Sequence, residues 1–139
     1  MDSKKIDTGF IVRCDIGDEV VSSLGGFAAK NSIYSGTVRG IGALEKVVLG
    51  YFDVKSKQYI RREFDGVFEL LSLSGNFSKK GNETILHCHV VISDKEFHVF
   101  GGHLFSAVVA ITGEFYIIPG GKEIRRGPDE ATGLNLIKL

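Results

Sequence analysis

The sequence predicts an α+β fold, in which one main helix packs on a mixed, antiparallel-rich β-sheet. Three observations support this prediction. Apolar residues recur at helical spacing in one segment only, residues 15–32. Apolar runs separated by Gly-rich or polar turns fill most of the chain after that segment. With 139 residues, 43% of them hydrophobic, the chain has the length and composition of one globular domain.

The first predicted elements are a short strand at residues 10–14 and the helix that follows it. Asp18 and Glu19 fall in the first helical turn, where the helix dipole favours anions. Gly25 and Gly26 each weaken the helix by about 1 kcal/mol relative to Ala, which indicates either close packing on the sheet or an early helix end. The apolar positions that share one helix face are Val20, Val21, Leu24, Phe27 and Ala28.

All later elements are predicted strands, and polar residues at 79–82 and 93–96 form two of the turns between them. The strand at 106–118 is apolar nearly throughout, so we expect it at the centre of the sheet with both faces covered. Residues 1–139 form one domain, with a core at about 10–118 and a C-terminal tail at 119–139. The predicted strands are 32–42, 43–53, 58–64, 66–78, 84–92, 97–103 and 106–118.

Composition argues against a general electrostatic grip on nucleic acid. Lys and Arg total 17 and Asp and Glu total 17, whereas nonspecific binding requires a surplus of cations. The pairs Arg61–Arg62 and Arg125–Arg126 are interpreted as solvated. The N-terminal segment lacks an apolar signal sequence, and no apolar run approaches the roughly 20 residues of a membrane helix. We therefore expect a cytoplasmic protein with reduced, buried Cys14 and Cys88.

Three of the four histidines are candidates for one site. His87 and His89 lie two residues apart on a predicted strand, so their side chains share a face. If residue 91 pairs with residue 99 across a three-residue loop, His103 lies opposite His87 on that face, and Gly101 leaves space opposite His89. A two-residue turn instead places His103 on the other face, unless glycines 101 and 102 form a bulge. His98 is expected to face elsewhere.

Such a trio can hold a divalent metal ion, although histidines in strands are also often ordinary hydrogen-bonding residues. Zinc bound by three imidazoles at about 2.1 Å keeps an open fourth position, and nickel, copper or iron also accept imidazole. Zinc lowers the pKa of its bound water to about 7, and catalysis then needs a nearby carboxylate. Glu69 and Glu114 are the candidates for this carboxylate. Each could instead pair with a cation inside the sheet or at a subunit interface, or it could orient one of the ligand histidines.

Three stretches of the chain resemble the plants and prokaryotes conserved (PPC) domain: SGTVRGIGALEKVVLGYFD, GVFELLSLSGNFS and LHCHVVISDKEFHVFGGHL. The resemblance runs from about Phe10 to Ile118. It implies a sheet with a packed helix, a homotrimer and, as in prokaryotic relatives, zinc ligands at His87, His89 and His103. In plants the domain follows AT-hooks in nuclear DNA-associated proteins, where it mediates self-association and contacts with other nuclear proteins.

Two functions are consistent with these residues. One is a stand-alone trimeric metalloprotein that acts on a small polar molecule at the histidines. The other is a regulatory module that binds DNA or a protein without catalysis. The chain has no AT-hook, since no Pro follows the VRGIG stretch at 38–42, and its charge does not support DNA binding. Arg39 is a candidate for binding an anionic ligand in a trimer cleft.

Overall fold

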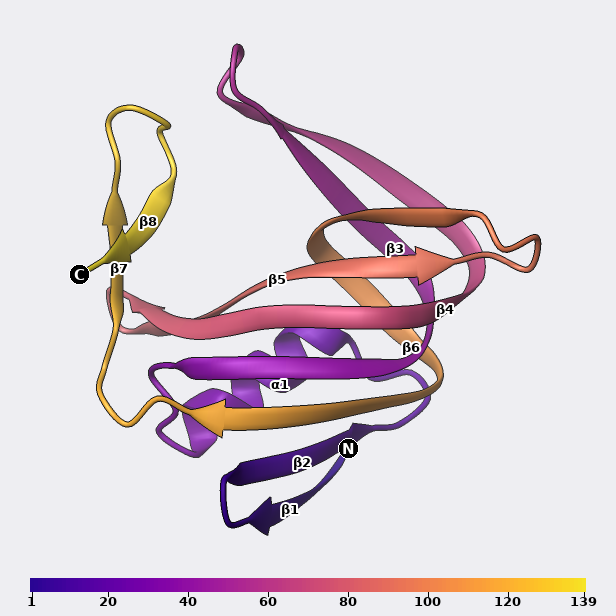
Figure 1. Ribbon diagram of the computed structural model, residues 1–139, viewed down its shortest axis with the longest axis horizontal. Coiled ribbons are helices and arrows are strands. Elements are labelled where there is room, and N and C mark those ends of the chain that lie inside the picture. The colour runs from indigo at the N-terminus through magenta and orange to yellow at the C-terminus, as the bar shows by residue number, and fades with distance from the viewer.

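The computed structural model describes residues 1–139 as a large sheet with one helix (Figure 1). The predicted α+β class with an antiparallel-rich, mixed sheet is confirmed. The elements are β1 (Asp2–Ile6), β2 (Gly9–Cys14), α1 (Val20–Lys30), β3 (Gly36–Asp53), β4 (Gln58–Lys80), β5 (Glu83–Ser93), β6 (Val99–Pro119), β7 (Arg125–Pro128) and β8 (Asn135–Lys138).

The sheet follows the order β1-β2-β6-β3-β4-β7-β8, and β5 pairs with both β4 and β6. Strands β3, β4, β5 and β6 therefore form a closed circuit of antiparallel pairings. The single parallel contact joins Lys79 of β4 to Arg125 of β7 and makes the sheet mixed. Because β5 and the start of β6 close this circuit, the strands that carry the histidines are tied together on both sides.

Helix α1 lies behind the sheet in Figure 1 and begins one residue after Glu19. The Glu19 carboxylate caps the helix by accepting hydrogen bonds from the backbone N–H groups of Val21 and Ser22, and it also accepts one from Ala107 of β6. The predicted place of Asp18 and Glu19 inside the first turn is thus wrong, since both precede the helix. The Glu19 carboxylate thus links the start of α1 to strand β6.

The glycine pair in α1 has neither of its two predicted explanations. The helix continues past it to Lys30, so it does not end early. A Cβ added at Gly25 or Gly26 meets no atom within 4 Å, so the pair does not mark close packing on the sheet. Nothing in the structure explains why glycine stands at these two positions.

The core lies between α1 and the inner face of the sheet. Val20, Leu24 and Phe27 of the helix are buried against strand residues there. Cys14 and Cys88 are free and buried in this core, as predicted. Burial raises the pKa of the Cys14 thiol to about 11 and that of the Cys88 thiol to about 12. Both side chains are inert apolar parts of the core.

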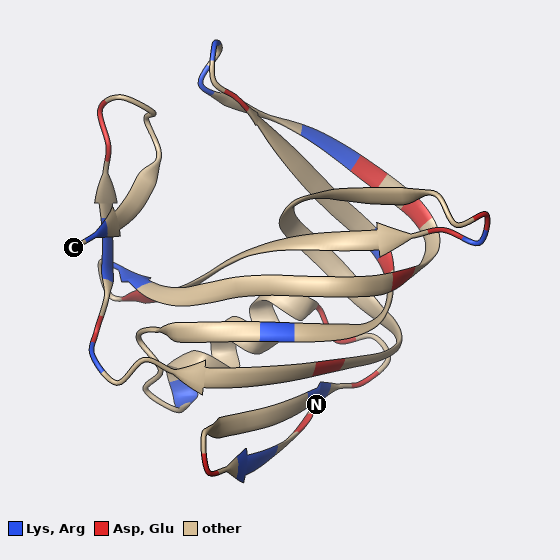
Figure 2. Cartoon of the chain, viewed as in Figure 1, with Lys and Arg blue, Asp and Glu red and all other residues tan.

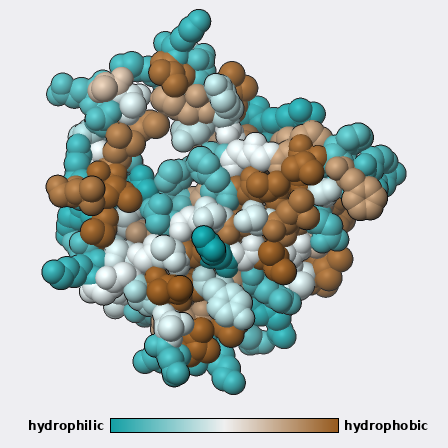
Figure 3. All heavy atoms as spheres, in the orientation of Figure 1, coloured by the Kyte–Doolittle hydropathy of each residue, from teal (hydrophilic) through white to brown (hydrophobic).

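Strand β6 lies between β2 and β3, which confirms its predicted central position. Within the single chain, only one of its two faces is covered, contrary to the prediction. Ile111, Tyr116 and Ile118 keep 61%, 53% and 51% of their surface exposed, because α1 covers only the other face. We call this side the outer face, and Figure 3 shows apolar residues on the side of the molecule away from α1. Its exposed apolar side chains are Ile41, Leu71, Ile111, Tyr116 and Ile118.

The predicted C-terminal tail is a structured hairpin. Strands β7 and β8 pair over residues 125–138, and Figure 1 shows them standing beside the main sheet. Asp129 closes the turn by accepting hydrogen bonds from the backbone and hydroxyl of Thr132, and Gly133 has a φ of 76° that favours glycine. Figure 2 shows charged residues gathered at the loops and strand ends, while the middle of the sheet carries few.

No helix of this chain has the length and apolar character that crossing a membrane requires.

Candidate metal centre

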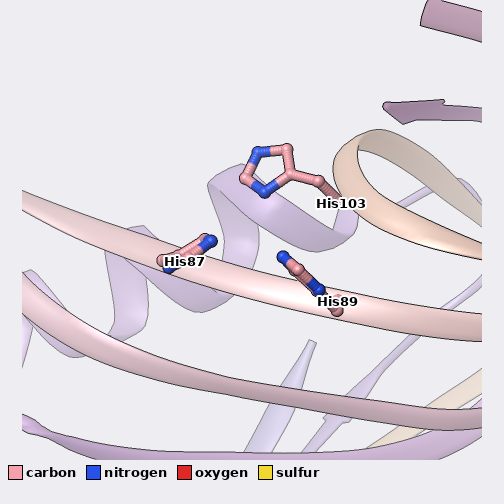
Figure 4. Close-up of side chains that lie close together, drawn as sticks. All are labelled: His87, His89 and His103. Carbon is pink, nitrogen blue, oxygen red and sulfur yellow. The ribbon is translucent and has the colours of Figure 1, made fainter. Parts of the chain in front are cut away.

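The structure brings His87, His89 and His103 together on one face of the β5–β6 pair (Figure 4). Ring centroids lie 5.3 Å apart for His87 and His89, 5.1 Å for His87 and His103, and 5.6 Å for His89 and His103. Each ring contributes one nitrogen atom, and these three nitrogens lie within 4.8 Å of one another. Three such nitrogens can reach a common ion with small side-chain adjustments.

The register of the pair differs from the predicted one. His103 lies opposite His89 rather than His87, and Gly101 lies opposite Val91. The reason is a longer loop at residues 94–98, in which the Asp94 carboxylate accepts hydrogen bonds from the backbone N–H groups of residues 96 and 98. The shift amounts to two residues, and side chains alternate with a period of two, so the three histidines still share a face.

The glycine that makes room beside His103 is Gly50 of β3, not Gly101. Gly50 pairs with His103, and a Cβ there would stand 2.4 Å from the Phe105 ring and 3.0 Å from the Tyr59 ring. Those two rings contact the imidazole of His103 at centroid distances of 4.8 Å for Phe105 and 5.1 Å for Tyr59. The missing side chain of Gly50 therefore lets two aromatic rings hold the imidazole in place.

Two of the three imidazoles, those of His87 and His103, have a lowered pKa that favours the neutral form. Burial lowers the pKa of His103 to about 4, with further lowering by the neighbouring histidines and by Arg61 and Arg126. Burial, then Arg126, also lowers the pKa of His87. The Nδ1 atom of His103 is buried and has no hydrogen-bond partner. Neutral imidazole is the form that binds metal ions.

Arg126 of β7 fixes the ring of His87, a role that the sequence did not indicate. One of its terminal nitrogens lies 3.1 Å from Nδ1 of His87 and donates also to Asn76 at 3.0 Å. Since a guanidinium only donates, Nδ1 of His87 is the acceptor and Nε2 carries the ring proton, so metal binding through Nε2 requires the Arg126 bond to break and the proton to move to Nδ1. Further bonds to Ser78 and to the Asn135 carbonyl hold the guanidinium itself. The interpretation of Arg126 as solvated is wrong, because the hairpin folds it onto β4 and β5.

The donor set fits a divalent transition metal. Three imidazoles match zinc sites that keep a fourth position open, and they also suit other late transition metals. The unpartnered Nδ1 of His103 is an atom that such an ion would satisfy. Cys88 lies between His87 and His89 in sequence but is buried on the opposite side, so it offers no sulfur ligand.

The other candidate residues do not join the histidines. Glu69 is exposed on β4, whereas the β4 residue that pairs with His89 is Ser74. The two positions are five residues apart, so at roughly 3.4 Å per residue Glu69 lies on the order of 15 Å from the histidines. Glu114 is exposed beside Arg13 of β2. Neither carboxylate can shuttle a proton at this site.

Two further positions lie apart from the trio. Arg39 is exposed on β3 and lines a shallow hollow of the outer face together with Glu114, away from the histidines. His98 bonds Asp94 in the loop and faces elsewhere, as expected.

A cavity of about 270 Å³ opens beside the trio, between the C-terminal hairpin and the main sheet. His87 and His103 lie in its wall, and no carboxylate does. Figure 3 shows an opening in the surface next to the hairpin. The lining residues are Tyr59, Lys80, Ile85, Leu86, His87, His103, Arg126, Leu134, Asn135 and Leu136.

Comparison with known proteins supports the same relationship as the sequence motifs. A candidate DNA-binding protein from Bacteroides thetaiotaomicron is 31% identical, with 99% of this chain and 96% of that chain covered and a TM-score of 0.95. A metal-containing protein from Archaeoglobus fulgidus is 35% identical over all of both chains, with a TM-score of 0.87. The bifunctional protein GlmU of Synechococcus sp. (strain JA-3-3Ab) is 28% identical over 120 residues, 84% of this chain, and the chain spans only 18% of that protein.

The model of the Plants and Prokaryotes Conserved (PCC) domain, the family abbreviated PPC above, matches residues 1–119. That range contains the strands of all three histidines and ends before the hairpin that carries Arg126. The chain therefore belongs to the PPC domain family.

Proposed function

We propose that this protein is a metal-binding member of its family, which holds one divalent transition metal ion, zinc first, through His87, His89 and His103. The observation that carries the proposal is that each of the three rings offers one nitrogen within 4.8 Å of the others, while the buried Nδ1 of His103 has no partner in the protein. A buried polar atom without a partner is unfavourable, and an ion at this point removes the deficit. The metal-containing relative from Archaeoglobus fulgidus supports the same reading.

Elemental analysis of purified protein tests the proposal. After incubation with zinc and desalting, we expect about one metal ion per chain. His89→Ala should lose the ion and keep the fold, because His89 is exposed while its neighbours Cys88 and Val90 form the core. His98→Ala, which removes an exposed loop histidine, should bind metal as the wild type does. A wild-type protein that retains no metal rules out the function.

We further propose a homotrimer whose contacts cover the outer face. Isolated protein surfaces rarely expose so many neighbouring large apolar side chains, and such patches mark interaction sites. Arg39 and Glu114 lie beside each other in a hollow of this face, so both become interface residues in the assembly. Multi-angle light scattering should give three times the mass of the 15.2 kDa chain, and a monomer mass contradicts this part of the proposal.

A zinc ion in this site supplies Lewis acidity to a ligand at its open position. The chain contributes an aromatic and apolar wall through Tyr59 and Leu86, and it contributes positive charge through Arg126. With Glu69 and Glu114 elsewhere, the proposal contains no carboxylate proton shuttle. The site is therefore proposed to bind a small polar molecule at the ion.

DNA binding is the second candidate, because the relative from Bacteroides thetaiotaomicron is a candidate DNA-binding protein. Two observations argue against DNA binding. The net charge is zero, and positively and negatively charged residues are mixed at the strand ends. A mobility-shift titration with random and AT-rich duplexes at low salt separates the two functions. A complex that weakens steeply with salt supports the DNA module, and no shift at low salt eliminates it.

A further inference from the structure

The cavity beside the histidines has an unusual charge composition. Arg126 and Lys80 both line it, and no Asp or Glu does. Neither cation forms an ion pair with a carboxylate of the chain. Burial lowers the pKa of Arg126, which reflects the cost of enclosing its charge. A partly buried guanidinium without a counter-charge favours an anion from outside the chain.

The guanidinium of Arg126 has one donor to offer such an anion. Four of its five N–H groups are used, by Ser78, Asn135, Asn76 and His87. The fifth lies on the nitrogen that bonds the Asn135 carbonyl. One free N–H, supported by the flexible ammonium of Lys80, suits a monoanion with two oxygens. A phosphate dianion, with three acceptor oxygens and more charge to desolvate, needs a richer set of donors.

The rest of the wall is apolar, which indicates that the ligand has a carbon skeleton. Ile85 and Leu86 of β5 and Leu134 and Leu136 of the hairpin line the cavity, and the Tyr59 ring adds an aromatic surface. Its volume of about 270 Å³ equals that of about nine waters at ~30 Å³ each. This is below the usual range for drug-sized ligands, so the ligand is small.

We propose that this cavity binds a small organic carboxylate, whose anionic group contacts Arg126 and Lys80 and whose apolar part packs against the β7–β8 hairpin. The inference rests on the proposed function in one respect, since an ion on His87 and His103 at the cavity wall adds positive charge next to the carboxylate. The hairpin residues of this site lie beyond residue 119, outside the part of the chain that matches the family model. Ligand selection therefore depends in part on a segment that lies outside this match but is aligned in the relatives from Bacteroides thetaiotaomicron and Archaeoglobus fulgidus.

Isothermal titration calorimetry with benzoate, benzamide and inorganic phosphate tests this site. Benzoate and benzamide have the same shape and size, and only benzoate is charged. We expect benzoate to bind zinc-loaded wild-type protein at least about tenfold more tightly than benzamide, and also more tightly than phosphate. In metal-free protein the preference for benzoate should remain, with a weaker affinity. Equal binding of the two aromatic probes, no binding of either, or tighter binding of phosphate overturns the proposal.

The variants locate the anion. Arg126→Gln should weaken benzoate binding about tenfold or more, while Arg125→Gln, which removes the neighbouring cation that pairs with Glu123, should leave it unchanged. Lys80→Gln changes an exposed side chain and should weaken benzoate about threefold, which keeps the test open if Arg126→Gln does not fold. Unchanged affinity in both Arg126→Gln and Lys80→Gln also overturns the proposal. Metal content is measured separately, so failure of the metal site is distinguished from failure of the anion site.

Discussion

Gly50→Ala adds a single methyl group behind the candidate metal centre. Gly50 lies on β3 opposite His103, and its backbone does not have a positive φ. Alanine therefore meets no conformational penalty, and its effect is steric. The new Cβ would stand 2.4 Å from Cε2 of Phe105 and 3.0 Å from Cδ1 of Tyr59, in a region where both rings already pack against the imidazole.

The size of the effect follows from these distances. Carbon atoms in contact prefer about 3.5–4.0 Å, so the Phe105 ring or β3 must move by about 1 Å. Overpacking of this kind costs about 1–3 kcal/mol in the free energy of unfolding. Metal ligands tolerate displacements of only about 0.2 Å, and disturbing the groups that orient a ligand weakens metal affinity by about 10–100-fold. Gly50→Ala should thus lose both stability and zinc affinity.

Urea denaturation and competitive zinc titration measure the two effects. Gly26→Ala is the matched control, because it adds the same methyl group where a Cβ meets no atom within 4 Å. It should raise the free energy of unfolding by up to about 1 kcal/mol, as alanine does in a helix, and leave zinc affinity unchanged. If Gly50→Ala binds zinc within about threefold of wild type and unfolds within about 0.5 kcal/mol of it, the idea that Tyr59 and Phe105 position His103 is refuted.

Three further outcomes follow from the structure. Metal-free protein should lose stability to urea as pH falls from about 6.5 to about 4, because the unfolded chain takes up a proton that folded His103 excludes, and His103→Gln should flatten that slope. Glu69→Gln and Glu114→Gln should keep wild-type zinc content and benzoate affinity. Lower zinc content or benzoate affinity in either variant would mean that its carboxylate does act at the site. Ile111→Asp should give monomers in light scattering, while Ile16→Asp, also exposed but outside the outer face, should stay trimeric.

The convergence of the histidines was predictable because it depends on parity. His87 and His89 share a face in any strand. His103 joins them in the observed register and in every register shifted from it by an even number of residues. The exact partner was not predictable, because it depends on the loop at 94–98, where the Asp94 carboxylate organises the backbone of two residues. Hydrophobic periodicity contains no information about such a side-chain bond.

The surroundings of the site were not predictable for a different reason. Arg126 lies 39 positions after His87 in sequence and reaches it only because the hairpin folds back onto β4. A pair of arginines in a Gly-rich segment has the appearance of a solvated surface, and no strand was predicted in the tail at 119–139. Tyr59 likewise lies in a polar stretch, and its contact with His103 depends on the closed circuit of strands.

Alternation along β5 also explains why site and fold can vary separately. Cys88 and Val90 point into the core, whereas His87 and His89 point to the opposite side of the strand, toward His103. Replacing a core residue of this strand leaves a void beneath α1 and weakens the whole domain. Replacing a histidine removes a ligand at the surface of the same strand and leaves that packing intact. The fold can thus be retained in relatives with other chemistry, and in this chain the proposed function depends on side chains that the core does not require.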